Sequence, residues 1–262
     1  KVFHKNVLAN NGEIVAACDV CEEYLAKAKE KWGDQVSTYT DFDEMLEHSD
    51  IDLVVLSNYF HEHAPYAIKA LKKNIHVLSE CTSNATMAEG VALVRAAEES
   101  KAFYMISENY PFMRHNSEIK KLYDRGDLGR VIYGEAEYNH PISPHNLGEM
   151  KSLCPSSKHW RYTIPRTYYI THSLAPLMHI TGSIPKRVIA LPATLDTPIT
   201  YDGGITRGTL ERAAIIMTQN DDGSVFRVCG CAAFGAHNNS YRVCGTEGQI
   251  ESLRGMSNKI ML

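Results

Sequence analysis

The 262-residue chain has the composition of an ordinary globular protein, with 44% apolar residues, 22% charged residues and a formal net charge of −4. A weakly acidic chain has no basic field for nucleic acid or anionic lipid, and no stretch approaches the ~20 apolar residues of a membrane-spanning helix. The length suits one large domain or, more readily, two. We expect a cytoplasmic protein that binds neither nucleic acid nor membrane.

Seven cysteines are scattered along the chain. An odd, unpaired set suits a reducing compartment better than a disulfide framework. The pairs Cys18-x-x-Cys21 and Cys229-x-Cys231 are not followed by a second ligand pair at zinc spacing, and no cluster of His and carboxylates has ligand spacing. We therefore expect no metal site.

Residues 1–107 alternate strands and helices, the pattern of a doubly wound parallel sheet. The predicted strands are Ile14–Cys18, Leu53–Leu56, Ile75–Leu78 and Phe103–Ile106, and the predicted helices are Val2–Ala9, Glu22–Trp32, Phe42–Glu47, His61–Lys72 and Met87–Glu99. Because the chain opens inside a predicted helix, we expect a first strand and its glycine loop to precede Lys1. Residues 1–107 should form a dinucleotide-binding domain.

From residue 108 the pattern changes to strands rich in β-branched, aromatic and Cys residues. The predicted strands are Val131–His140, Lys186–Leu195, Glu211–Gln219, Val225–Ala233 and Ser240–Val243, and the predicted helices are Asn116–Tyr123 and Tyr168–Thr181. We expect residues 108–262 to form an α+β domain with a large, mainly antiparallel open sheet. The chain stops without a closing element, so we expect this domain to be truncated.

Asp19 directly follows the first predicted strand. An acid at that place in a dinucleotide-binding sheet binds the ribose hydroxyls of the adenosine half. Its charge would repel a 2′-phosphate, and no Arg follows it, so NAD is favoured over NADP. A cap for helix Glu22–Trp32 is an equally good interpretation of Asp19 alone.

Polar residues also follow the next two strands, at the edge where ligands of open α/β sheets bind. Ser57 and Asn58 come after one strand and Glu80 after the other. A carboxylate that closes a buried strand is costly to desolvate without a partner or ligand, so Glu80 is a site candidate. For His63, a satisfied residue in the first helical turn is the simpler interpretation.

Acid/base groups gather again in Tyr168-Tyr169-Ile170-Thr171-His172, at the predicted start of the long helix. At i and i+3, Tyr169 and His172 share one helix face, and both side chains can exchange a proton with a sugar hydroxyl. The alternative is that Tyr168 belongs to the core and His172 is a satisfied interior group. Tyr138 and His140 are candidates for pocket lining.

One stretch carries a specific signature: Asp50-Ile51-Asp52-Leu53-Val54-Val55-Leu56, then Asn58, His63, Ala67, Ala70-Leu71, His76-Val77 and Glu80. This signature resembles that of the Gfo/Idh/MocA oxidoreductase family. The resemblance extends to Asp19, Asp127-Leu128-Gly129, Trp160-Arg161 and His172 before Gly182. It implies a Rossmann domain holding NAD(P), a second domain whose open sheet forms a homodimer or homotetramer, and hydride exchange with a ring hydroxyl of a sugar, glycoside or cyclitol.

The resemblance also implies a role for each matched residue. Asp19 would bind the adenosine ribose, and His172 would be the active-site histidine. The cofactor would be lined by Asn58, His63 and Glu80, with Asn109 at the domain junction and Trp160 and Arg161 near the nicotinamide. Tyr168, Tyr138 and His140 are then candidates for binding substrate.

Two positions depart from the family pattern. The family usually continues Glu80 with Lys-Pro, and its Lys acts in acid/base catalysis, but this chain has Cys81-Thr82. The family also has an Asp four residues before the histidine, where this chain has Tyr168. The usual proton relay is absent, which leaves the proton to Tyr169 and His172.

The Tyr169-Ile170-Thr171-His172 segment is similar to the Tyr-x-Thr-His segment of the NAD-dependent glycosidases built on this fold. Those enzymes keep NAD bound, oxidise the sugar at C3, eliminate the aglycone and return the hydride. Three hypotheses follow: an NAD-dependent oxidoreductase, a redox-neutral glycosidase, and an NAD-binding protein without catalysis.

Overall fold

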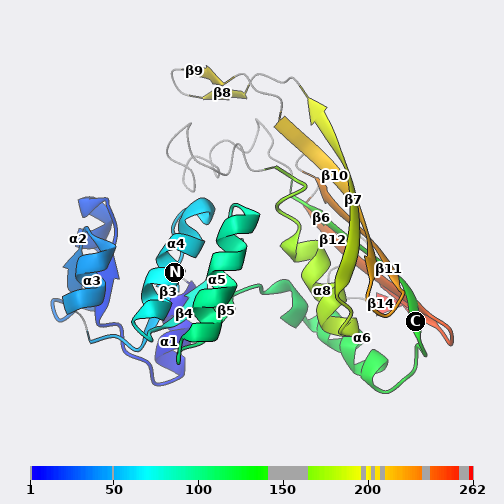
Figure 1. Cartoon of the computed structure of the whole chain (residues 1–262), viewed down its shortest axis with the longest axis horizontal. Coiled ribbons are helices and arrows are strands. Elements are labelled where there is room, and N and C mark those ends of the chain that lie inside the picture. Colours follow the sequence, from blue (N-terminus) through cyan, green and yellow to red (C-terminus); the bar gives the residue numbers. More distant parts are fainter. Residues whose placement is uncertain are drawn as a thin grey trace. The chain divides into compact units, whose positions relative to one another are not determined.

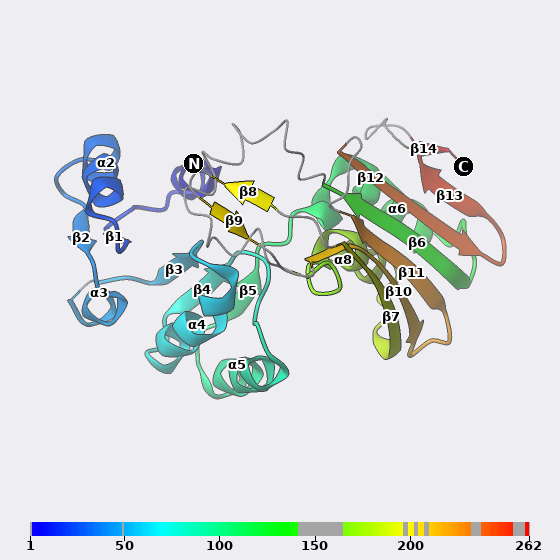
Figure 2. The ribbon, with the colours of Figure 1, turned by 90° about the horizontal axis from the view of Figure 1, so that it is seen from above.

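The computed structural model describes residues 2–48, 50–140, 165–195, 199–201, 204–206, 210–231, 237–253 and 260–261. The chain divides into two compact units, Lys1–Ser107 and Glu108–Leu262 (Figure 1, Figure 2). Within the described ranges, every helix is too short or too polar to cross a membrane.

The N-terminal unit alternates short strands with helices. In chain order it contains α1 (Val2–Ala9), β1 (Ala16–Cys18), α2 (Glu22–Trp32), β2 (Ser37–Tyr39), α3 (Phe42–His48), β3 (Leu53–Leu56), the 3₁₀ helix η1 (Phe60–Glu62), α4 (His63–Lys72), β4 (His76–Ser79), α5 (Met87–Glu99) and β5 (Tyr104–Ile106). The strands form two parallel sheets, β1–β2 and β3–β4–β5. The predicted parallel α/β fold is confirmed, and β2 is an addition to it.

Helix α4 shows why this part of the sequence folds as predicted. Ala64, Ala67 and Leu71 recur at helical spacing and are fully buried. They pack in one cluster with Val54 of β3 and Val77 of β4. Since β3 and β4 run parallel, their carboxyl ends lie at the same edge of the sheet.

The C-terminal unit is built on a seven-stranded sheet. Its elements are η2 (Tyr110–Phe112), α6 (Arg114–Asp124), β6 (Val131–Asn139), α8 (Thr171–Thr181), β7 (Pro185–Leu195), β8 (Ile199–Tyr201), β9 (Gly204–Thr206), β10 (Leu210–Asn220), β11 (Val225–Cys231), β12 (Asn238–Gly245), β13 (Gln249–Ser252) and β14 (Ile260–Met261). The strand order is β14-β13-β12-β6-β11-β10-β7, with β6 and β11 parallel and the other neighbours antiparallel. The predicted mainly antiparallel sheet is confirmed.

One face of this sheet is covered by helix α8, and the other is exposed. Phe226, Val228 and Val243 are buried on the face that α8 contacts (Figure 1). On the opposite face, Leu191 of β7 lies across from Ile215 of β10, and Leu191 is 71% exposed. Strand alternation therefore produces one core face and one open face.

The helix predicted to start at Tyr168 begins at Thr171 instead. Residues before it form a turn, in which the backbone N–H groups of Tyr168 and Tyr169 both donate to the carbonyl of Pro165. Tyr169 therefore does not share a helix face with His172, and another contact must explain any pairing between them.

Candidate active site

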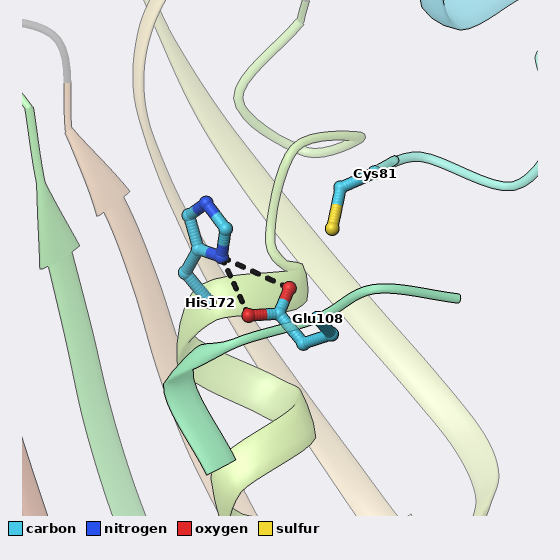
Figure 3. A group of neighbouring side chains, drawn as sticks. All are labelled: Cys81, Glu108 and His172. Atoms are coloured by element: carbon cyan, nitrogen blue, oxygen red, sulfur yellow. Dashed lines mark hydrogen bonds and ion pairs between the residues drawn. The ribbon is translucent and has the colours of Figure 1, made fainter. Parts of the chain in front are cut away.

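His172 lies in the first turn of α8 between a carboxylate and a phenol of the same unit. Its Nδ1 is 2.7 and 2.9 Å from the two carboxylate oxygens of Glu108 (Figure 3), and its Nε2 is 3.1 Å from Tyr169 Oη. All three residues are less than 10% exposed. Because a carboxylate can only accept, Nδ1 donates to Glu108, and in this tautomer Nε2 accepts from the Tyr169 hydroxyl. Glu108, His172 and Tyr169 thus form a continuous chain of hydrogen bonds, called the relay below, whose arrangement resembles that of a catalytic triad.

Further hydrogen bonds hold Glu108 and His172, two members of this relay. Glu108 Oε1 also accepts a hydrogen bond of 3.0 Å from the backbone N–H of Tyr110. Tyr241 Oη donates at 2.7 Å to the backbone carbonyl of His172. Burial raises the pKa of Tyr241, so this phenol keeps the proton that it donates.

Two aromatic rings fix the orientation of the His172 imidazole. Tyr110 stacks on it at a centroid distance of 4.1 Å, and Tyr138 meets it edge-on at 4.6 Å. Asn116 Nδ2 donates to the backbone carbonyl of Tyr110 at 2.8 Å, which holds the stacking ring in place. Burial raises the pKa of Tyr110, so its phenol stays neutral beside the relay.

Tyr138 also forms, with His140, a second pair of side chains that can exchange protons. Its Oη is 2.9 Å from His140 Nδ1, and the His140 ring stacks on that of His237 at 4.6 Å. The two predicted substrate-binding residues Tyr138 and His140 thus contact each other, and Tyr138 contacts the relay through His172. Their role in binding substrate stays a prediction.

The other predicted site residues of this unit are Tyr168, Asn109, Trp160 and Arg161. Tyr168 is half-buried in the turn before α8. Asn109 is exposed at the start of η2. Trp160 and Arg161 lie outside the described residues.

In the N-terminal unit, the predicted cofactor residues follow three strand ends. Asp19 follows β1, and its Oδ1 accepts from the backbone N–H of Cys21 at 2.8 Å. Since Cys21 is the residue that precedes α2, this contact holds the turn rather than capping the first helical N–H groups. Ser57 and Glu80 follow β3 and β4, whose paired last residues place them at one edge of the sheet.

His63 uses both ring nitrogens on the backbone. It is 1% exposed, with Nδ1 2.6 Å from the Thr82 carbonyl and Nε2 3.2 Å from the Asn58 carbonyl. The ring therefore ties the segment after β3 to the segment after β4. Carbonyl oxygens only accept, so a ring with one N–H donates to one of the two, and the shorter distance points to Thr82. This buried contact favours the structural interpretation of His63, and its contact with a cofactor stays a prediction.

Glu108 and Tyr110 were not singled out in the sequence. Glu108 follows β5 after Ser107, so it is an acid just beyond the carboxyl end of a parallel strand. The same signal drew attention to Glu80. The presence of an acid just beyond a parallel strand would also have identified Glu108 as a candidate, but not its contact with His172.

Residues 1–108 match the family model of an oxidoreductase family with an NAD-binding Rossmann fold, GFO_IDH_MocA. This match confirms the Gfo/Idh/MocA resemblance seen in the sequence for the N-terminal unit, whereas the similarity of the Tyr169–His172 segment to NAD-dependent glycosidases stays a prediction. The family supplies an NAD-binding oxidoreductase domain.

Curated relatives share part of the sequence. A glycosyl hydrolase family 109 protein of Shewanella woodyi is 30% identical over an alignment of 178 positions that covers 63% of this chain and 37% of that protein. A glycosyl hydrolase family 109 protein of Saccharopolyspora erythraea is 23% identical over an alignment of 172 positions that covers 63% of this chain and 38% of that protein. The chain thus spans little more than a third of the length of the curated relatives it matches.

Solved structures share the fold across both units. They include a probable dehydrogenase from Thermotoga maritima (TM-score 0.76, 18% identity, 95% of this chain and 71% of that one). A levoglucosan dehydrogenase in complex with NADH and L-sorbose has a TM-score of 0.78 at 21% identity, covering 92% of this chain and 64% of that one. The myo-inositol 2-dehydrogenase from Lactobacillus plantarum has a TM-score of 0.70 at 18% identity, covering 92% of this chain and 68% of that one. The fold is that of an oxidoreductase with sugar and inositol dehydrogenases among its neighbours.

Proposed function

We propose that this protein is an NAD-dependent oxidoreductase that transfers a hydride to or from a ring hydroxyl of a sugar, glycoside or cyclitol. The observation that carries the proposal is the relay of Glu108, His172 and Tyr169, because hydride transfer at a hydroxyl carbon also requires a group that takes or returns the hydroxyl proton. Membership of the N-terminal unit in an NAD-binding oxidoreductase family supports the cofactor. The names of the sugar and inositol dehydrogenase neighbours support the substrate class.

The relay can move the proton in either direction. In oxidation, the substrate hydroxyl gives its proton to Tyr169 Oη while the phenolic proton passes to His172 Nε2. Glu108 accepts from Nδ1 throughout and stabilises the imidazolium that forms. NAD, when bound, accepts or returns the hydride.

The residues after β1 fit NAD. Asp19 Oδ1 is fixed by the N–H of Cys21, and Oδ2 makes no hydrogen bond within the described residues, so the carboxylate can accept from ribose hydroxyls. The residues that follow, Val20 and Cys21, carry no positive charge for a 2′-phosphate. We therefore propose NAD rather than NADP as the cofactor.

Asp19→Ala tests this cofactor assignment. We expect the variant to bind NAD about 10-fold or more weakly, since hydrogen bonds to a charged group contribute roughly 1.5–3 kcal/mol. The preference for NAD over NADP should narrow, because the repulsion of the 2′-phosphate is lost. Titration calorimetry with both nucleotides measures the two affinities, and Asp34→Ala, at an exposed acid between α2 and β2, is the matched control. Unchanged affinities in Asp19→Ala would refute the assignment.

A redox-neutral glycosidase is the second candidate. Curated relatives carry the name glycosyl hydrolase family 109 protein. Elimination of an aglycone after transient oxidation at C3 also needs two proton groups, one to remove the C2 proton and one to protonate the departing oxygen. The pair of Tyr138 and His140 beside the relay offers the second group.

One experiment separates the hypotheses. The purified protein is incubated with NAD and a panel of sugars, cyclitols and aryl glycosides, while NADH and released aglycone are followed together. An oxidoreductase accumulates NADH with a sugar or cyclitol. A glycosidase releases aglycone with no net NADH, and an NAD-binding protein without catalysis does neither while retaining the nucleotide.

We also propose a homodimer or homotetramer formed through the open sheet face. Exposed Leu191 and Ile215 lie side by side on that face. Further across the sheet, Glu135 forms ion pairs with Arg227 and Arg242. An apolar area next to a compensated charged cluster suits contact with a second copy of the chain.

A further inference from the structure

Tyr169 owes its position to a turn rather than to a helix. It precedes α8, and its backbone N–H donates to the Pro165 carbonyl at 3.1 Å. A turn of this kind is held by few backbone hydrogen bonds, so its own contacts leave the phenol less firmly placed than a helical residue. Whatever anchors the turn also sets the distance between Tyr169 Oη and His172 Nε2.

The anchor is a carboxylate from the sheet. Glu211 Oε2 accepts from the backbone N–H of Thr167 at 2.9 Å and from its hydroxyl at 2.7 Å. Both bonds are made to one charged oxygen, and charge-assisted bonds of this type are about twice as strong as neutral ones. They join two segments that are 44 residues apart in the sequence.

An irregularity in β10 turns Glu211 toward this contact. Ala213 pairs with Ala193, but Glu211 pairs with Thr194, so β10 gains one residue over β7 at Arg212. In a regular strand, Glu211 would share the open face with Ala213 and Ile215. The inserted residue moves it to the face that carries buried Ala214, where α8 and the preceding turn lie.

The same turn rests directly on β11. A Cβ at Gly230 would lie 3.4 Å from the Arg166 carbonyl oxygen and 3.7 Å from that of Tyr169. The absence of a side chain at Gly230 lets the backbone of the turn pack against β11, while Glu211 of β10 binds the turn by hydrogen bonds. In the sheet, Gly230 also pairs with Tyr138, the residue that meets His172 edge-on.

We propose that Glu211 is a positioning residue for the reaction, which holds Tyr169 in hydrogen-bond reach of His172 through Thr167. The inference rests on the proposed function of the relay. Glu211 itself does not touch His172. Its contribution is to keep the phenol within the narrow range of geometry that proton transfer requires.

The test compares Glu211→Leu with Glu211→Gln. Gln keeps an acceptor oxygen for both Thr167 bonds, whereas Leu removes it. We expect Glu211→Leu to lower kcat by about 10–10²-fold, because a small misplacement of a reacting group can cost 10²-fold, while KM changes little. Glu211→Gln should recover most of the loss. Thr167→Val removes only the hydroxyl bond and should give an intermediate kcat. If Glu211→Leu does not fold, Thr167→Val replaces it in the comparison.

A matched control separates positioning from stability. Ser183, 3% exposed beyond the other end of α8, donates to Asp222 Oδ2 at 2.7 Å, so Ser183→Ala removes a comparable buried bond far from Tyr169. It should lower the unfolding midpoint without lowering kcat. If Ser183→Ala lowers kcat as much as Glu211→Leu does, the proposed role of Glu211 is overturned.

A spectroscopic readout keeps this inference apart from the proposed function. The imidazole NMR resonances of His172, assigned by their loss in His172→Ala, should shift in Glu211→Leu and return in Glu211→Gln. A shift without turnover of any sugar by the unaltered protein would refute the function and support the anchor. Turnover combined with unshifted resonances in Glu211→Leu would refute the anchor alone.

Discussion

His172→Ala should lower turnover by about 10²–10⁴-fold, the usual contribution of a positioned acid/base group. His172 is the member of the relay that contacts both of the others, so its removal separates Glu108 from Tyr169. His179→Ala is the matched control, because His179 lies on the same helix, is exposed and packs against Phe112. The measurement is kcat for the best substrate of the panel, with NAD binding checked in both variants.

Tyr169→Phe should cause a loss of similar size. It keeps the ring but removes the hydroxyl that contacts His172 and that we propose exchanges a proton with the substrate. If both variants keep turnover within about threefold of the unaltered protein, the relay is not the proton path. If Tyr169→Phe is active and His172→Ala is not, the substrate hydroxyl meets His172 directly, and Tyr169 has only a structural role.

Much of the N-terminal fold could be predicted because its signals are local. The bounds of α2 and α5 are those predicted, since apolar residues recur at helical spacing and polar residues flank each helix. Thr86 and Glu89 form a capping box at the start of α5. Strand β2 was missed because three residues, only partly buried, carry no alternation that distinguishes them from a loop.

The site was only partly predictable, because its contacts join distant segments. Tyr169 and His172 were identified as a pair, but the stated reason, a shared helix face, was wrong. Their contact depends on a turn held by Glu211, and nothing near Tyr169 in the sequence reveals that carboxylate. Likewise, the carboxylate of Glu108 reaches His172 across 64 residues.

The absence of the family's Lys and Asp therefore does not leave His172 without an acid partner. At the family's Asp position this chain has Tyr168, but Glu108, from another segment, places a carboxylate beside the His172 ring. The absence of those two residues is what suggests an NAD-binding protein without catalysis, and the contact between Glu108 and His172 weakens that hypothesis. A buried carboxylate is costly to retain without a partner, and here the partner is the predicted active-site histidine.

Glu108→Gln should lower kcat by about 10²-fold or more, because loss of the carboxylate that orients a catalytic histidine can cost as much as 10⁴-fold in a triad. The neutral amide of this variant cannot stabilise an imidazolium by charge, and its NH₂ group can donate to Nδ1 and so favour the wrong tautomer. Glu108→Asp keeps the charge on a shorter side chain and should be less impaired. Unchanged kcat in Glu108→Gln would show that His172 acts without this carboxylate.

The double variant Glu108→Gln/His172→Ala gives the sharper version of this test. Residues that act as one unit have non-additive effects, so the double variant should be no slower than His172→Ala alone. A carboxylate that contributed independently, for example by holding η2 through the N–H of Tyr110, would add its own loss. Single-turnover measurements on all three variants distinguish these cases, because they report the chemical step without product release. Additive losses would place Glu108 outside the relay even though it lies within hydrogen-bond distance of His172.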